Sequence, residues 1–274
     1  MANYYLHPTS DQGTGDGSSE VNAKQFSTTN LNTAEAQASS GNIIYFLNGD
    51  YTLTADLAMD AADGVIYQSL EPLGAKLKAS SGFKYLSFPN DVSVKDFQTE
   101  DLNFDITADN TTVILSGLSH AYSSSHNVSG ASAVFKAYAT TRFFTVSNSV
   151  FVPDFSGSAQ AMFFDQNTAG TTFSNCTIFI KATNATQVLN TYGGDNVAYT
   201  NCILSSDDNS VISLSDGSNN VADHCTNCCL YDFGSNNTSG GTNNVFADPQ
   251  FVDSTTGDYR LRPASPCISA GTAS

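Results

Sequence analysis

The sequence predicts an all-β solenoid in which short parallel strands stack coil upon coil, and three observations lead to this fold class. A repeat of 26 to 27 residues occupies the second half of the chain. Inside each repeat, apolar and polar residues alternate with the period of two that is typical of strands. Short apolar segments separated by Gly, Asn, Asp and Ser fill the first half.

The repeat centres on asparagine. Four segments align, 146–151, 173–178, 199–204 and 225–230, and they carry Asn148, Asn175, Asn201 and Asn227 at equivalent positions. Ser or Thr precedes each Asn, Ser or Cys follows it, and Phe, Ile or Leu stands three residues later. A helical repeat of this length would show apolar residues at i, i+3, i+4 and i+7 together with strong helix formers. These segments are rich in Asn, Ser, Thr and Phe instead, so a helical solenoid is excluded.

Stacked coils bring equivalent residues into columns with a spacing of about 4.8 Å. The four asparagines would then form a ladder, in which each side-chain amide bonds the next and each residue adopts the left-handed bend between two strands. Cys176, Cys202 and Cys228 share the next column, which should point inward. We expect them to be reduced thiols that pack as small hydrophobes, although neighbouring coils would also permit a disulfide.

The first half continues the same pattern with less regularity. Its expected strands are 43–47, 66–69, 75–78, 84–88, 92–97, 102–106, 113–118 and 134–138. No Pro/Gly-rich linker and no charge block interrupts them, so we predict one domain over residues 1–274, of roughly seven to nine coils. Within it, an N-terminal cap and first coil occupy 1–50, further coils occupy 51–235, and a closing segment occupies 236–274.

Charge limits the partners that the chain can bind. Ten Lys and Arg stand against 26 Asp and Glu, which gives a formal net charge of −16. Such a field repels phosphate backbones and anionic membranes, and it weighs against strongly acidic polysaccharides. The sequence has no run of 18 apolar residues that could span a membrane. We therefore expect neither nucleic acid nor membrane as a partner, and neutral glycans, cations and proteins remain.

Both ends of the chain resemble the right-handed parallel β-helix proteins that are often called pectin-lyase-like. The N-terminal likeness lies in 4–8, 13–17, 33–38, 41–45 and 49–51, and the C-terminal likeness lies in 248–253, 257–261 and 265–271. The resemblance implies a short N-terminal capping helix in the Ala-rich stretch 33–38. It also implies a closing segment, in which we expect Phe251, Leu261 and Ile268 to plug the last coil while nearby prolines stop further strand pairing.

The same resemblance admits polysaccharide lyases, glycoside hydrolases, adhesins, and phage tail or capsid proteins, and fold alone does not choose among them. The lyases need clustered basic residues, yet Lys136, Arg142 and Lys181 do not share a column. The polygalacturonase-like hydrolases carry four motifs, of which only an Asp-Asp pair, Asp207-Asp208, is present. We therefore assign no catalytic residue.

One constellation is a candidate binding site. Six residues after successive ladder asparagines stand Asp154, Lys181 and Asp207, with Asp208 adjacent. On stacked coils they would alternate acid, base, acid, with Asp154 and Asp207 about 10 Å apart, near the separation of an inverting glycosidase pair. The alternative interpretation is a solvated salt ladder. Because Trp is absent, an aromatic sugar platform would have to use Tyr or Phe, such as Tyr122, Tyr138 or Tyr192.

Metal chemistry receives little support from the sequence. The four histidines, His7, His120, His126 and His224, are dispersed without zinc spacing. Acidic loops at 11–16 and 207–208 offer oxygen ligands of the kind that Ca²⁺ takes, but no consensus loop is present. We predict no required cofactor and no metal site, with Ca²⁺ the one ion left open.

Two functions from different classes remain. The first is a non-catalytic surface protein, a phage virion component such as a capsid decoration or tail fibre, whose partners are other virion proteins or a cell-surface glycan and which could assemble as a trimer. No signal peptide is visible at the N-terminus, which fits a virion or extracellular protein released by lysis. The alternative is a carbohydrate-active enzyme, a polysaccharide lyase or glycoside hydrolase.

Overall fold

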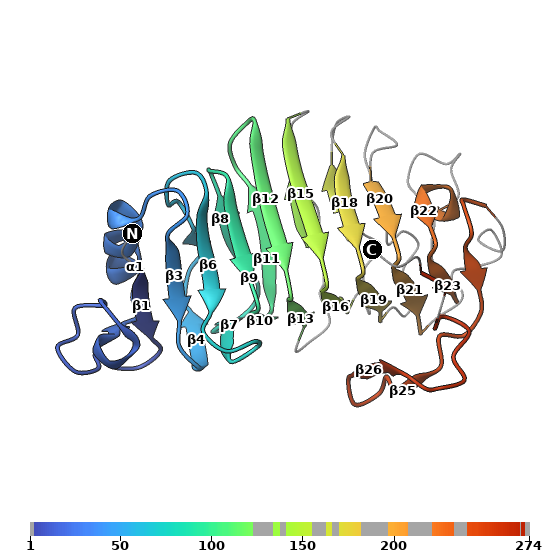
Figure 1. Ribbon diagram of the computed structural model, residues 1–274, viewed down its shortest axis with the longest axis horizontal. Coiled ribbons are helices and arrows are strands. Elements are labelled where there is room, and N and C mark those ends of the chain that lie inside the picture. The colour runs from blue at the N-terminus through green and yellow to red at the C-terminus, as the bar shows by residue number, and fades with distance from the viewer. Residues whose placement is uncertain are drawn as a thin grey trace. The chain divides into compact units, whose positions relative to one another are not determined.

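A computed structural model describes residues 3–122, 134–137, 141–154, 163–165, 170–181, 197–207, 221–232, 240–268 and 270–271 (Figure 1). The chain divides into two compact units. The first comprises residues 1–123 and 135–145, and the second comprises 124–134 and 146–274. Each unit is described by itself, and the prediction of one domain over 1–274 stays a prediction.

The first unit consists of one helix, a short 3-10 turn and three parallel sheets. Its elements are β1 (Tyr4–His7), η1 (Glu20–Asn22), β2 (Lys24–Gln25), α1 (Thr28–Gln37), β3 (Ile43–Phe46), β4 (Gly49–Leu53), β5 (Leu57–Ala58), β6 (Val65–Ser69), β7 (Ala75–Ala79), β8 (Lys84–Phe88), β9 (Val92–Lys95), β10 (Gln98–Glu100), β11 (Leu102–Ile106), β12 (Thr111–Ser116), β13 (Ser119–Ala121) and β14 (Phe135–Ala137). β15 (Arg142–Ser147) begins in this unit and ends in the second.

From β3 to β14, strands that follow one another in the chain belong to different sheets, and each sheet takes every third strand. The orders are β2-β1-β3-β6-β9-β12, then β4-β7-β10-β13, then β5-β8-β11-β14. Within the described residues, the strand pairings inside these sheets are parallel and in register. This winding of one chain through three parallel sheets is a parallel β-helix, which confirms the predicted fold class.

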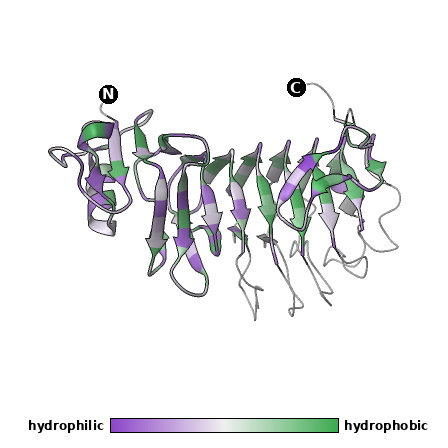
Figure 2. Cartoon of the chain, turned by 90° about the horizontal axis from the view of Figure 1, so that it is seen from below, coloured by the Kyte–Doolittle hydropathy of each residue, from purple (hydrophilic) through white to green (hydrophobic). Residues whose placement is uncertain are grey.

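The core of the first unit follows from the alternation along each strand, and single strands carry both hydrophobic and hydrophilic stretches in Figure 2. In the first sheet, the register stacks Ile44, Tyr67, Val94 and Leu115, all of them fully buried. In the third sheet, Phe104 stacks on Phe135 with ring centroids 5.2 Å apart. Burial of such side chains contributes about 1.5–3 kcal/mol each, which makes these columns the main source of stability.

The predicted capping helix is confirmed, but it begins earlier than the Ala-rich stretch suggested. The side chain of Ser27 accepts a hydrogen bond from the backbone N of Asn30 and so caps α1 at its N-terminus. Leu31, Ala34 and Glu35 are buried. Glu35 accepts a 2.5 Å hydrogen bond from the hydroxyl of Tyr67 in β6, which ties the helix to the coils.

The second unit repeats the winding. Its elements are β16 (Val150–Val152), β17 (Phe163–Asp165), β18 (Thr171–Ser174), β19 (Thr177–Ile180), β20 (Val197–Thr200), β21 (Ile203–Ser206), η2 (Val221–His224), β22 (Cys225–Thr226), β23 (Cys229–Tyr231), β24 (Val245–Phe246), β25 (Phe251–Asp253) and β26 (Asp258–Leu261). One sheet has the order β18-β20-β22 and another the order β16-β19-β21-β23-β24. The hairpin of β25 and β26 is antiparallel.

Asn148, Asn175, Asn201 and Asn227 occupy equivalent bends of this unit, with φ between 51° and 54°. The backbone N of each asparagine donates to the carbonyl of the residue that precedes the next one, as in the 3.0 Å bond from Asn175 to Thr200. Asn243 extends the column with φ 54°, and its side-chain amide donates to Oδ1 of Asn227 at 3.3 Å. The left-handed bend explains the recurrence of Asn, since few other side chains tolerate it.

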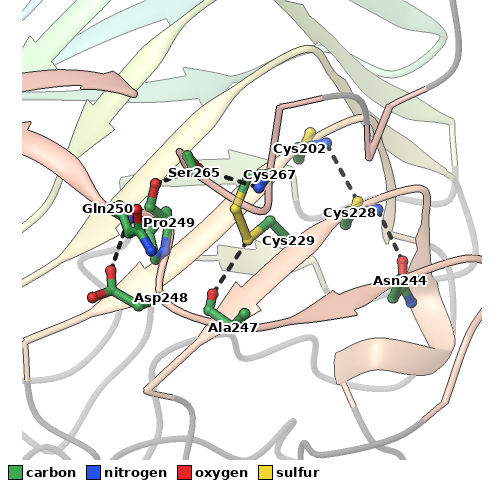
Figure 3. Close-up of a disulfide and its surroundings, with 10 residues drawn as sticks. All are labelled: Cys202, Cys228, Cys229, Asn244, Ala247, Asp248, Pro249, Gln250, Ser265 and Cys267. Atoms are coloured by element: carbon green, nitrogen blue, oxygen red, sulfur yellow. Dashed lines mark hydrogen bonds between the residues drawn. A yellow bond between two sulfur atoms is a disulfide. The ribbon is translucent and has the colours of Figure 1, made fainter. Parts of the chain in front are cut away.

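The closing segment does not lie where the sequence predicted. Cys229 of β23 forms a disulfide with Cys267, so the segment is fastened to the sheet of β16, β19, β21 and β23 (Figure 3). Phe251 packs against Phe179 of β19, with ring centroids 5.9 Å apart. Phe179 stands on the opposite side of its strand from the core residue Ile178, which means that the segment covers the outer side of this sheet.

The expected plug of Phe251, Leu261 and Ile268 is therefore wrong. Ile268 is 46% exposed, and Leu261 pairs with Phe251 in the antiparallel hairpin. Cys267, next to Ile268, is the buried residue of that stretch. The expectation that Cys176, Cys202 and Cys228 form no disulfide is confirmed, whereas the pairing of Cys229 with Cys267 was not predicted.

Candidate functional site

The outer side of the third sheet in the first unit carries a group of polar side chains that we call the outer-face cluster. It consists of Tyr85 in β8, Asn103 and Asp105 in β11, Lys136 in β14 and Arg142 at the start of β15. The alternation along these strands turns Leu86, Phe104 and Phe135 inward and hence the cluster residues of β8, β11 and β14 outward. The register sets Asn103 beside Tyr85 and Asp105 beside Lys136.

Asp105 and Lys136 form a half-buried charge pair. Nζ of Lys136 lies 3.8 Å from Oδ2 of Asp105, and the two side chains are only 19% and 18% exposed. Burial raises the pKa of the Asp105 carboxyl, while the charges of Lys136 and Arg142 act in the opposite direction. The raised pKa indicates that desolvation outweighs the attraction of both cations.

The ring of Tyr85 completes this part of the cluster. Nζ of Lys136 lies 5.0 Å from the centre of the Tyr85 ring, which is within the range of a cation–π contact. The ring is half-buried, and the backbone N of Tyr85 donates to Oδ1 of Asp56 at 2.9 Å. Aromatic ring, ammonium group and carboxylate thus lie side by side on three neighbouring strands.

Arg142 borders the same group from β15. Its Nε donates to Oδ1 of Asp109 at 3.1 Å, and one of its terminal nitrogens donates to the carbonyl of Ile106, the last residue of β11, at 2.8 Å. The side chain is 17% exposed. These bonds orient the guanidinium group beside the end of the strand that carries Asp105, so it contributes fixed positive charge there.

Asn103 stands beside Tyr85 in the register and is fully buried. Its Oδ1 accepts a 2.7 Å hydrogen bond from the hydroxyl of Tyr122, which also reaches the carbonyl of Leu102 at 3.4 Å. Its Nδ2 has no hydrogen-bond partner among the described residues. An unpaired buried donor costs about 1–3 kcal/mol, so such a group is expected to meet a ligand or an ordered water.

The arrangement can recognise a polyhydroxylated ligand. A carboxylate accepts from hydroxyl groups, an ammonium and an amide donate to them, and an aromatic ring offers an apolar face. A half-buried carboxyl with a raised pKa is also a suitable general acid. Within the described ranges, no three His, Cys, Asp or Glu side chains converge on one point where they could hold a metal ion.

The sequence-predicted site residues lie in the second unit. Asp154 and Lys181 form an isolated parallel bridge, and the backbone N of Asp207 donates to the carbonyl of Ile180 at 3.1 Å. The three positions therefore follow one another on successive coils. Asp154 and Lys181 are half-buried and Asp207 is exposed, whereas Asp208 lies outside the described residues.

The closing hairpin approaches this column. Burial, with a further contribution from the charge of Asp207, raises the pKa of Tyr259 to about 12. Tyr259 packs against Phe179 at 5.2 Å between ring centroids. The column thus borders the closing segment, and its role as a binding site stays a prediction.

Sequence reasoning missed the outer-face cluster. Lys136 and Arg142 belong to different strands, as expected, but the long side chain of Arg142 reaches back to Ile106 and brings both cations to Asp105. Asp105 stands at an outward position of the predicted strand 102–106, which was the one available signal. Tyr122 is buried and supports Asn103, so it cannot serve as a sugar platform, and Tyr138 and Tyr192 lie outside the described residues.

Comparison with known proteins gives a weak structural likeness. No family model matches the sequence, and no curated protein matches it. Among solved structures, the chain is similar to the pectin methylesterase PemA from Erwinia chrysanthemi, with 11% identity and a TM-score of 0.48, over 84% of this chain and 71% of that one. A pectin methylesterase in complex with hexasaccharide VII gives 12% identity and a TM-score of 0.44 with the same coverage.

The chain folds as a right-handed parallel β-helix. The parallel in-register strands establish this by themselves, and the weak structural likeness adds no statement about activity. The described part of the β-helix contains no helix long and apolar enough to cross a membrane.

Proposed function

We propose that this β-helix protein binds a glycan at the outer-face cluster. The supporting observation is the buried amide of Asn103, whose Nδ2 has no partner among the described residues, directly beside the half-buried pair of Asp105 and Lys136 and the ring of Tyr85. A sugar presents several hydroxyl groups together with apolar ring faces, and this mixture of groups is what the cluster matches.

Charge favours a neutral glycan over an acidic one. The two cations of the cluster each face a carboxylate, Lys136 facing Asp105 and Arg142 facing Asp109. A sugar carboxylate would have to compete with those partners in the field of a chain whose net charge is −16. Neutral hydroxyl groups can instead bond to charged partners that stay paired.

The wider role that we propose is that of a surface protein. The rigid coil stack would act as a scaffold for adhesion, at the virion surface or outside the cell, with other virion proteins or a cell-surface glycan as partners and a trimer as the assembly. This part rests on the sequence alone. Detection of the protein in purified virions, stoichiometric with a known shell protein, would support it, and its recovery only as a free secreted monomer would contradict it.

A second candidate function, a carbohydrate-active enzyme, is favoured by one observation. The raised pKa of Asp105 is a property of general acids that protonate a leaving-group oxygen. Asp105→Asn distinguishes the two functions, because it removes the proton donor and keeps the shape. A binding protein retains part of its affinity in this variant, whereas an enzyme loses turnover and retains affinity.

The test is a panel of neutral and acidic polysaccharides, scored for binding, for reducing ends and for unsaturated products. We expect Lys136→Met and Asp105→Asn each to weaken binding about 10-fold or more, the effect of losing one hydrogen bond to a charged group. The matched control is Lys78→Met, because Lys78 pairs with Asp50 at 2.5 Å on the outer side of a different sheet of the same unit. Equal affinity in all three variants would overturn the proposed site.

A further inference from the structure

Four cysteines of the second unit form a continuous column of thiols. Cys176, Cys202 and Cys228 follow the ladder asparagines on successive coils, and Cys225 stands beside the last of them. The thiol of Cys202 contacts those of Cys176 and Cys228, and the thiol of Cys225 contacts that of Cys228. None of the four belongs to a disulfide, and each is at most 2% exposed.

The backbone repeats the same environment around each thiol of the column. Sγ bonds the carbonyl two residues earlier, at 3.3 Å from Cys176 to Ser174, 3.3 Å from Cys202 to Thr200, and 3.4 Å from Cys228 to Thr226. The backbone N of Cys202 also donates to Sγ of Cys228 at 3.4 Å, as the dashed line in Figure 3 marks. The sulfur positions are thus fixed by the coil repeat, whose rise is about 4.8 Å.

A metal ion binds cysteine as the thiolate, so it must displace the thiol protons that backbone carbonyls accept in this column.

The geometry of the column restricts the metal. Zinc takes four ligands in structural sites, but within the described part of the chain no three metal-binding side chains converge on one point. A row of sulfurs suits an ion that takes two thiolates in a line, and soft thiolate ligands select ions such as Cu⁺. The net charge of −16 raises the local concentration of any cation.

We propose that the thiol column is a binding site for a thiophilic monovalent metal ion, Cu⁺ or Ag⁺, held between neighbouring sulfurs. The ion replaces the protons of two neighbouring thiols. Two metal–sulfur bonds form, two sulfur–hydrogen bonds break, two protons pass to water per ion, and no group is oxidised. Four thiols in a row accommodate two ions, and this inference is independent of the proposed glycan site.

The experiment titrates the full chain with Ag⁺ alone in oxygen-free buffer that contains no reductant, so that the disulfide of Cys229 and Cys267 stays intact. Native mass spectrometry counts bound ions, and a pH-stat counts released protons. We expect two ions per chain and two protons per ion. Cys225→Ala should reduce the count to one ion, and the double variant Cys202→Ala/Cys225→Ala should reduce it to none.

The matched control is Cys229→Ser/Cys267→Ser, which removes two cysteines outside the column and should still bind two ions. Circular dichroism establishes that each variant is folded. A second readout needs no variant: after Ag⁺ is added to the wild-type chain, a brief alkylation in denaturant should leave Cys176, Cys202, Cys225 and Cys228 unmodified. No bound ion in the wild type, or a count that the column variants leave unchanged, would overturn the proposal.

Discussion

The buried carboxyl of Glu35 makes the stability of the N-terminal cap depend on pH. Burial raises its pKa from 4.5 to about 8, although the hydrogen bond from Tyr67 acts in the opposite direction. Oε1 accepts from the Tyr67 hydroxyl at 2.5 Å and from the backbone N of Asp60 at 3.2 Å, and Oε2 has no partner among the described residues. The protonated form is therefore the form that the fold accommodates.

The sign and size of the effect follow from linkage. A group whose pKa is raised by folding contributes stability that is fully present below the unfolded value, 4.5, and is lost as the pH rises through the folded value, about 8. At about 1.4 kcal/mol per pH unit between the two values, the loss amounts to at most about 5 kcal/mol. Asp11, Asp50 and Asp258 have lowered pKa values, so their contributions change below this window.

The perturbation is Glu35→Gln, which keeps one carbonyl oxygen for Tyr67 and Asp60 but cannot ionise. Denaturant unfolding, followed by circular dichroism at pH 5, 6, 7, 8 and 9, gives the free energy of unfolding of both proteins. The wild type should lose stability from pH 5 to about pH 8 and then level off, whereas the variant should lose much less, so the difference between the two proteins shifts in favour of the variant as the pH rises. Parallel curves across the whole range would refute the reasoning.

Three further predictions concern packing, the bends and the closing segment. Phe104→Ala should lower the free energy of unfolding by about 3–5 kcal/mol in denaturant melts, because the ring is fully buried against Phe135; a loss below 1 kcal/mol would show that the column is not core. Asn201→Ala should cost about 1 kcal/mol, since φ is 54° there, and Asn201→Gly should cost less than Asn201→Ala. Cys229→Ser/Cys267→Ser should cost about 4 kcal/mol for a separation of 38 residues, and a reductant should destabilise the wild type but not this variant.

The sequence was informative where residues alternate within a strand and where the coil length is constant. β8 and β11 begin and end at the predicted residues, 84–88 and 102–106, and in β11 apolar and polar residues alternate throughout. The bends at the ladder asparagines follow a repeat of 26 to 27 residues, and Asn243 was overlooked because only 16 residues separate it from Asn227. A search for asparagines at a constant spacing cannot find one that belongs to a shorter coil.

Variable coil length also explains why the sequence did not predict the candidate site. Phe104 stacks on Leu86, which stands 18 residues earlier, but on Phe135, which stands 31 residues later. The register between β11 and β14, which sets Asp105 beside Lys136, therefore follows from no periodicity in the chain. The reach of Arg142 to Ile106 depends on a side-chain conformation that no pattern encodes. The place of the closing segment depends likewise on the pairing of Cys229 with Cys267.

The measurement that tests the central claim most directly is a crystal structure of the protein soaked with the best-binding oligosaccharide from the polysaccharide panel. Our account predicts sugar density over the outer side of β8, β11 and β14, with a hydroxyl group within hydrogen-bond distance of Asp105 or Lys136 and a sugar oxygen at Nδ2 of Asn103. Sugar bound instead along Asp154, Lys181 and Asp207, with the outer-face cluster unchanged, would contradict it.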